Sequence, residues 1–187
     1  MREILLLRHG VTRENQRHVY TGAQDVALAP EGRAALAARR DQYPAGAMYF
    51  TSGMLRARET LEALYGDVPH VDIAELGEYR FGAFEMRGHE ALLREEPLYR
   101  AWLEPGAVDV VCPGGESQRM FSERVWTGWR KLCAHRWDGL AVLVAHGGVL
   151  TNLLRRQGYD VTTPPNGCGW RAELDETGAI AAAEVFP

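Results

Sequence analysis

Lysine and cysteine are scarce in this chain of 187 residues. Lys131 is the only lysine, and the resulting excess of arginine is what codon usage in a GC-rich genome produces. The three cysteines are far apart and include no C-x-x-C pair, which argues against a disulfide framework and against a zinc knuckle. So few thiols suit a reducing compartment, and we therefore expect the protein in the cytoplasm.

Long hydrophobic runs and a net positive charge are also missing. The first apolar run ends at Arg8, so it is far shorter than the roughly 20 residues of a membrane span and does not resemble a signal peptide. The net charge of −4 at pH 7 argues against a nucleic-acid partner, which would require a basic surface. We expect neither a membrane nor a nucleic acid as a partner.

Three short apolar runs each lead into polar residues. They cover residues 4–7, 47–50 and 141–145, and such continuous hydrophobicity is typical of strands that are buried on both faces of a parallel sheet. Helical patterns occupy the intervals, and a pair of edge strands is expected after them. The predicted helices are 30–40, 55–64, 116–135 and 149–156, and the predicted last strands are 169–174 and 179–186.

This alternation of strands and helices predicts the fold class, an α/β three-layer sandwich whose mostly parallel central sheet is flanked by helices. The length favours one domain over residues 1–187, with a small lobe at about 77–115, the least regular stretch. Ligands bind such sheets at the carboxyl ends of the strands. That geometry would bring together His9, residues 52–56 and His146, which lie far apart in the sequence.

The first predicted strand ends in Arg8-His9-Gly10. This tripeptide combines an imidazole nucleophile, a guanidinium group and a bend at which the backbone can approach a ligand. A histidine at a strand end can equally be a structural residue that is satisfied by the backbone. A metal site is disfavoured, because the neighbouring arginine repels a divalent cation and attracts phosphate. The sequence therefore predicts no metal ligand here.

Arg56 follows another predicted strand end and lies in the first turn of a predicted helix. Backbone N–H groups at a helix start favour anions, and the arginine can add a bidentate pair of hydrogen bonds to a phosphate. Arginines on helix surfaces are more often simply solvated. Taken alone, Arg56 is compatible with both interpretations.

Four segments in combination indicate a protein family far more specifically than any one of them does. Together they resemble the histidine phosphatase superfamily, also called phosphoglycerate mutase-like, and the spacing between the segments is maintained. The resemblance extends from about residue 4 to about residue 170 and implies the phosphoglycerate mutase-like fold. The segments that carry it are 6–15, 20–32, 52–57 and 144–148.

The resemblance implies roles for the residues of these motifs. His9 would be the nucleophile that is phosphorylated during turnover. Phosphoryl transfer mainly requires in-line positioning and positive charge on the equatorial oxygens, which two arginines can supply without a cofactor. The residues implied to catalyse the reaction or to bind the phosphate, besides His9, are Arg8, Asn15, Gly22, Arg56, His146 and Gly147.

A proton donor for the leaving alcohol is implied in the segment 75–86. The family has a leucine-x-glutamate there, and its glutamate corresponds to Glu78, which would act as general acid and then as general base. A carboxyl group beside a bound phosphate keeps its proton more readily, because like charges disfavour ionisation. We assign Glu85 to the structure of the lobe, and we expect Glu116 to cap the long helix through its charge.

The implied activity is that of a phosphomonoester hydrolase acting on a small phosphorylated metabolite. A cofactor-dependent phosphoglycerate mutase is the first alternative, but the chain lacks the long insertion that mutases of this family carry after the catalytic glutamate. A non-catalytic phospho-ligand binder is the second alternative. The sequence leaves the oligomeric state open, with a homodimer as one option.

Within the family, the lobe is most similar to bacterial α-ribazole phosphatases, which act in cobalamin biosynthesis. Met86-Arg87 after the second glutamate and the run 99–102 carry this resemblance. It makes α-ribazole 5′-phosphate a candidate substrate. Four lobe side chains would then offer an apolar and stacking surface to the leaving group: Tyr79, Phe84, Met86 and Trp102.

Overall fold

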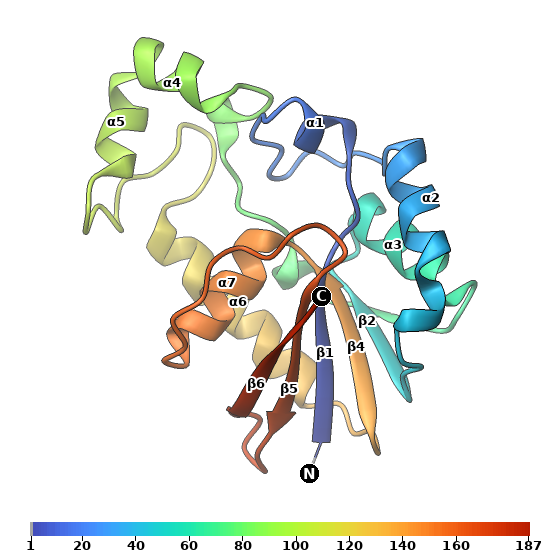
Figure 1. Ribbon diagram of the computed structural model, residues 1–187. Helices are drawn as coiled ribbons and strands as arrows, with labels where there is room; N and C mark the ends of the chain where they lie inside the picture. The colour runs from blue at the N-terminus through green and yellow to red at the C-terminus, as the bar shows by residue number, and fades with distance from the viewer. Residues whose placement is uncertain (1) are drawn as a thin grey trace.

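The computed structural model describes residues 2–187, which form an α/β fold around a six-stranded sheet (Figure 1). The strand order is β3-β2-β4-β1-β5-β6. The first four strands in this order are parallel, β5 is antiparallel to β1, and β6 is antiparallel to β5. The predicted fold class is confirmed. The strands are β1 (Arg2–Arg8), β2 (Met48–Thr51), β3 (Val71–Asp72), β4 (Leu140–Ala145), β5 (Gly169–Leu174) and β6 (Ile180–Phe186).

Strand β1 is covered on both faces, which explains its continuous apolar sequence. Leu5 and Leu7 pack with helices α2 (Pro30–Ala38) and α3 (Leu55–Tyr65). Ile4 and Leu6, pointing the opposite way, pack with helices α6 (Gln118–Cys133) and α7 (Gly147–Arg156). The helices predicted on either side of the sheet are therefore confirmed, with ends that shift by a few residues.

The predicted lobe contains two short helices, α4 (His89–Glu95) and α5 (Pro97–Leu103), which stand away from the sheet beyond its carboxyl edge (Figure 1). Its interior is formed by apolar side chains. The remaining helices are α1 (Arg13–Gln16) and the 3-10 turns η1 (Arg40–Gln42), η2 (Ala74–Leu76) and η3 (Gly82–Phe84). No helix within residues 2–187 has the length and apolar character needed to cross a membrane.

Arg124 of α6 anchors the segment that leads into the lobe. Its Nη1 donates to the carbonyls of Glu75 and Gly77, each at 2.8 Å, and its Nη2 donates to the Glu78 carbonyl at 3.0 Å. The same guanidinium group pairs with the nearly buried carboxylate of Glu116. One side chain therefore fixes three backbone carbonyls within residues 75–78.

Glu116 does not cap α6, and that expectation was wrong. The cap is Ser117, whose hydroxyl accepts from the Met120 N–H at 3.2 Å. The Glu116 carboxylate instead binds Arg124 and accepts from the Arg80 N–H at 2.9 Å. It turns away from the helix start because the guanidinium group offers a full positive charge and two hydrogen-bond donors.

We predict that Arg124→Ala lowers the free energy of unfolding by about 3–5 kcal/mol, because it leaves the Glu116 carboxylate buried without a cation. Urea denaturation at pH 7.5 measures the loss. Arg119→Ala is the matched control. Arg119 pairs with Asp109 on the exposed surface, so its removal should cost at most about 1 kcal/mol. Equal losses in the two variants would contradict the prediction.

Candidate active site

Neighbouring strands end at one edge of the sheet and place the two motif histidines side by side. Arg8 at the end of β1 lies opposite Ala145 at the end of β4, so His9 and His146 both follow at the carboxyl edge. Their ring centroids are 5.3 Å apart. Ser52, just after β2, hydrogen-bonds His146 Nε2 through its hydroxyl at 2.7 Å. The convergence expected from the strand ends is therefore present.

Gly10 fixes the tautomer of His9. The ring Nδ1 lies 2.7 Å from the Gly10 carbonyl oxygen, which can only accept a hydrogen bond, so Nδ1 carries the hydrogen. The lone pair of the neutral ring is therefore on Nε2. The side chain is only 4% exposed, which restricts the ring to one orientation. His9 thus has a free, oriented nitrogen nucleophile.

Both histidines are held in the neutral form. Burial and then the nearby charge of Arg56 lower the pKa of His9 well below its ordinary value. The same two causes lower the pKa of His146. Ser52 can donate to His146 Nε2, which leaves Nδ1 as an N–H donor, and this buried atom has no hydrogen-bond partner in the protein.

Arg56 is almost completely buried, with 1% of its surface exposed. Its Nη1 donates to the Gln24 carbonyl at 2.7 Å and its Nη2 donates to the Gly22 carbonyl at 2.8 Å. Burial lowers the pKa of Arg56, and the charge of Glu78 partly opposes this effect. Gly22 has a φ of +47°, a conformation that favours glycine and that lets its carbonyl face the guanidinium group.

Arg8 is held by a different loop from the one that holds Arg56. Its Nη1 donates to the Pro164 carbonyl at 2.8 Å, while its Nε is buried and has no partner in the protein. Burial lowers the pKa of this guanidinium group too. A buried N–H group without an acceptor is costly, and Arg8 Nε and His146 Nδ1 are two such donors that no acceptor of the protein satisfies.

Asn15 and Asn166 form a connected pair beside His9. Asn166 Nδ2 donates to the His9 carbonyl at 3.0 Å, to the Gly10 carbonyl at 3.2 Å and to Asn15 Oδ1 at 3.1 Å. Asn15 Oδ1 also accepts from the Thr12 N–H at 3.1 Å. The amide oxygen of Asn15 is therefore engaged, and its Nδ2 group remains available as a donor.

Glu78 is positioned by two backbone N–H groups. Its Oε1 accepts from the Tyr79 N–H at 2.9 Å, and its Oε2 accepts from the Gly148 N–H at 3.0 Å. A Cβ atom at position 148 would overlap this carboxylate, so glycine is required for the approach. The second glycine of the His146-Gly147-Gly148 motif thus links the lobe segment to the start of α7.

A cavity of about 160 Å³ opens onto these residues. Arg8, His9, Asn15, Gly22, Arg56 and Glu78, all predicted from the sequence, line it. His146 and Gly147 do not line it, because His146 lies fully buried and Gly147 packs against Thr163 and Arg8. The lining residues that the sequence reasoning did not assign are Thr12, Val19, Tyr20, Thr21 and Phe81.

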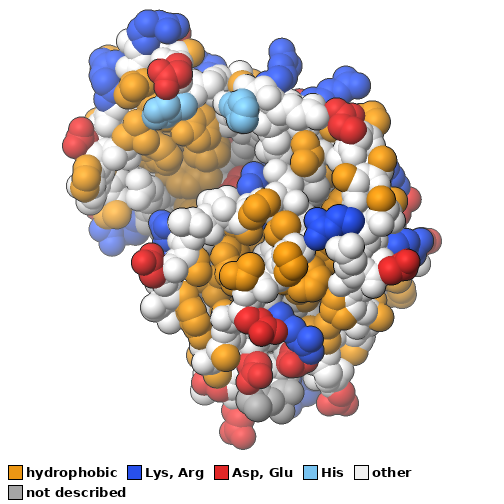
Figure 2. All heavy atoms as spheres, in the orientation of Figure 1, with side chains coloured by type: hydrophobic (Ala, Val, Ile, Leu, Met, Phe, Trp, Pro, Cys, Tyr) orange, Lys and Arg blue, Asp and Glu red, His pale blue; other side chains and the backbone are white. Residues whose placement is uncertain are grey.

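A second cavity, of about 440 Å³, adjoins the first and shares Arg8, Asn15, Val19 and Tyr20 with it. Its other lining residues are His18, His89 and Asn166. Figure 2 shows that the molecular surface is hollowed between the lobe and the rest of the molecule. The smaller cavity therefore suits a phosphoryl group, and the larger one suits the group that the phosphate is attached to.

Two of the aromatic lobe residues are not available to a ligand, contrary to expectation. Phe84 is 1% exposed and Tyr79 is 6% exposed, so both belong to the core. The Tyr79 hydroxyl donates to the Glu116 carbonyl and accepts from Trp102 Nε1, each at 2.9 Å. These rings pack inward with Leu92, Tyr99 and Cys112, which are also buried and belong to the same core cluster.

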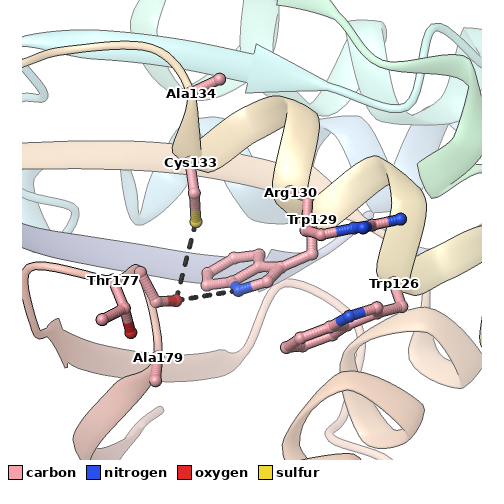
Figure 3. A pocket seen from close by; sticks show the side chains of 8 residues that line it. Trp126, Trp129, Arg130, Cys133, Ala134, Thr177 and Ala179 are labelled. Atoms are coloured by element: carbon pink, nitrogen blue, oxygen red, sulfur yellow. Dashed lines mark hydrogen bonds between the residues drawn. The ribbon is translucent and has the colours of Figure 1, made fainter.

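Another pocket, of about 310 Å³, lies between α6 and the β5–β6 turn and contains none of the motif residues (Figure 3). Trp126, Trp129 and Cys133 line it, and both Trp129 Nε1 and Cys133 Sγ hydrogen-bond to the Gly178 carbonyl. Burial raises the pKa of the Cys133 thiol to about 11. Within residues 2–187, no group of three or more His, Cys, Asp or Glu side chains is arranged to hold a metal ion.

Comparison with known proteins agrees with this site. The model of the histidine phosphatase superfamily (branch 1) matches residues 4–177. The chain is 28% identical to a 2,3-bisphosphoglycerate-dependent phosphoglycerate mutase of Mesorhizobium japonicum, over 99% of this chain and 98% of the relative. It is 30% identical to an adenosylcobalamin/α-ribazole phosphatase of Salmonella typhimurium, over 96% and 89%. These matches confirm the resemblance to the family.

Solved structures show the same fold. The α-ribazole phosphatase from Shigella flexneri superposes with a TM-score of 0.83 at 25% sequence identity, covering 98% of this chain and 95% of that one. The sheet, the flanking helices and the lobe therefore follow a known arrangement over nearly the whole chain.

The buried neutral histidines predict a pH dependence of stability. In the unfolded chain His9 binds a proton below about pH 6.5, whereas the folded protein resists protonation there. The unfolded state therefore binds more protons, and the free energy of unfolding falls as the pH decreases below 6.5. We predict that His9→Gln removes about 1.4 kcal/mol of the loss between pH 7.5 and 5.5.

Urea denaturation in phosphate-free buffer at the two pH values measures this difference. His70→Gln, at an exposed position in the loop before β3, is the matched control for the loss of an imidazole, because it leaves the buried His9 in place and should keep the acid sensitivity that His9 causes. A His9→Gln variant with the same acid sensitivity as the wild type would contradict the assignment of a neutral buried His9.

Proposed function

The chain belongs to the histidine phosphatase superfamily, branch 1, and from this we propose that it hydrolyses a small phosphomonoester through a phosphohistidine intermediate. The observation that carries the proposal is the state of His9. Its ring is neutral, its Nδ1–H is bound to the Gly10 carbonyl, and its Nε2 is free beside two buried arginines. A nucleophilic nitrogen next to desolvated guanidinium groups suits attack on phosphorus.

In the first step, His9 Nε2 attacks the phosphorus atom in line with the leaving oxygen. The N–P bond forms while the P–O bond to the leaving group breaks, and Glu78 transfers a proton to the departing alkoxide. In the second step, water attacks the phosphohistidine and gives up a proton to Glu78. The N–P bond breaks, inorganic phosphate leaves and the neutral ring is restored.

The equatorial oxygens of the phosphoryl group would be stabilised by donors that line the inner cavity together. Arg8 and Arg56 supply positive charge, and their backbone carbonyl partners hold the guanidinium groups in place before substrate binds. Asn15 Nδ2 is a further donor. We retain His146 as a phosphate ligand because its buried Nδ1 has no partner in the protein, although its ring is fully buried and does not line the cavity.

Hydrolysis is favoured over mutase activity by the charge of the outer cavity. A phosphoglycerate mutase must hold a bisphosphate, which requires cations for the second phosphate. Among the outer lining residues only Arg8 is an arginine or lysine, and it already serves the first phosphate. Arg87 of the lobe is paired with Glu95 and Glu96. The mutase nevertheless remains a second candidate, because a relative matching the full chain carries that name.

Within this activity, we propose α-ribazole 5′-phosphate as a candidate substrate. Two findings support it: a relative and a solved structure described as α-ribazole phosphatases both match nearly the whole chain. The lobe motif at residues 85–87 and 99–102 is the sequence feature that first suggested this subgroup. A non-catalytic phospho-ligand binder is disfavoured, because Arg8, His9 and Glu78 line one cavity together.

The wild-type protein is expected to hydrolyse p-nitrophenyl phosphate in the presence of EDTA. His9→Ala should lower kcat by at least about 10³-fold, because the variant lacks the nucleophile. Rapid quenching with a radiolabelled phosphomonoester should trap an acid-labile, alkali-stable phosphoryl group on the wild type and none on His9→Ala. His70→Ala is the control for the loss of an imidazole. A His9→Ala variant with wild-type turnover would overturn the mechanism.

A phosphate-release screen separates the candidate substrates. The panel contains α-ribazole 5′-phosphate, 3-phosphoglycerate, 2,3-bisphosphoglycerate and phosphoserine, with kcat/KM measured for each. We expect phosphate release from α-ribazole 5′-phosphate to be the most efficient, and no interconversion of phosphoglycerates when 2,3-bisphosphoglycerate is added. Interconversion without phosphate release would establish the mutase instead.

A further inference from the structure

Two side chains of the outer cavity and a buried tyrosine behind them form a hydrogen-bonded chain that the phosphoryl chemistry does not use. The Tyr20 and Tyr99 hydroxyl oxygens are 2.7 Å apart, and His89 Nδ1 is 2.6 Å from the same Tyr99 oxygen. Tyr20 and His89 line the cavity, while Tyr99, on α5, is 1% exposed. The buried hydroxyl therefore connects two groups that face the leaving group.

Tyr99 can donate only one hydrogen, so the chain has a direction. If Tyr99 donates to His89 Nδ1, the neutral ring carries its hydrogen on Nε2, and Tyr20 donates to Tyr99. If Tyr99 donates to Tyr20, His89 Nδ1 donates to Tyr99, Nε2 has a lone pair, and the Tyr20 hydroxyl hydrogen is free. Burial raises the pKa of Tyr99 above its ordinary value, which keeps this hydroxyl protonated.

In either direction, a neutral His89 and Tyr20 present opposite hydrogen-bonding characters to the cavity. One end of the chain is a donor and the other end is an acceptor. A carboxylate or a second phosphate, which only accepts, can satisfy one end but not the other. A hydroxyl group donates and accepts, so a pair of neighbouring hydroxyls satisfies both ends.

Resting on the proposed phosphatase function, we infer that Tyr20 and His89, coupled through Tyr99, select phosphomonoesters whose leaving group carries adjacent hydroxyls. The substrate class is therefore that of sugar and nucleoside phosphates, not phosphorylated carboxylic acids. The outer cavity of about 440 Å³ is within the range of about 300–1,000 Å³ that small-molecule sites occupy. It adjoins the phosphoryl cavity directly, as a ribosyl 5′-phosphate requires.

The test is a ratio of specificities. For each variant, kcat/KM is measured with ribose 5-phosphate, which has adjacent hydroxyls, and with phenyl phosphate, which has none. Tyr99→Phe removes the central hydroxyl, and we expect the ratio of ribose 5-phosphate to phenyl phosphate to fall about three- to tenfold, chiefly through KM for the sugar phosphate. Tyr65→Phe is the matched control, because the Tyr65 hydroxyl is buried without a partner and lies outside both cavities.

His89→Ala provides a second variant at an exposed position, where folding is not at risk, and it should lower the same ratio. Hydrolysis of both substrates with an unchanged ratio in Tyr99→Phe and His89→Ala would overturn this inference and leave the proposed function intact. Hydrolysis of phenyl phosphate but not of ribose 5-phosphate by the wild type would also overturn the inference. Failure of the wild type to hydrolyse either ester would instead refute the proposed function.

Discussion

The burial of two guanidinium groups beside two neutral histidines is the constraint on which the site depends. Removing Arg8 and Arg56 from water is costly, and it is tolerable because backbone carbonyls accept from both. Those carbonyls belong to Gly22, Gln24 and Pro164, so the loops that carry them are fixed to the sheet edge. Burial and then the charge of Arg56 lower the pKa of both imidazoles and keep them unprotonated, so the same removal from water acts on the arginines and on the histidines.

Glu78, the proposed general acid, is placed by an equally specific set of contacts outside the cavity. Arg124 holds the carbonyl of Glu78, the Gly148 N–H holds its carboxylate, and Glu116 balances the charge of Arg124. A lobe segment without regular secondary structure is therefore attached to both α6 and α7. This attachment makes the distance between Glu78 and His9 a property of the sheet and the helices.

The sequence predicted those features of the fold that depend on the pattern of neighbouring residues. Runs that are apolar throughout indicated doubly covered strands, and the strand ends brought His9, Arg56 and His146 to one edge of the sheet, whereas Glu78 was assigned by the resemblance to the family alone. It did not predict β3, which has two residues and therefore no periodicity, or the role of Arg124, whose partners are up to 49 residues away. Contacts of that kind follow from the packed fold and leave no signature in the spacing of neighbouring residues.

The lobe shows why residue type alone does not predict which side chains face the leaving group. Its aromatic residues suggested a stacking surface, yet Phe84, Tyr79 and Tyr99 are needed to fill a small interior. What faces the cavity is the polar rim of that interior, the Tyr20 hydroxyl and the His89 ring. The proposed phosphoryl chemistry thus rests on the sheet edge, and the proposed choice of leaving group rests on the rim of the lobe, in two adjoining cavities that share only part of their lining.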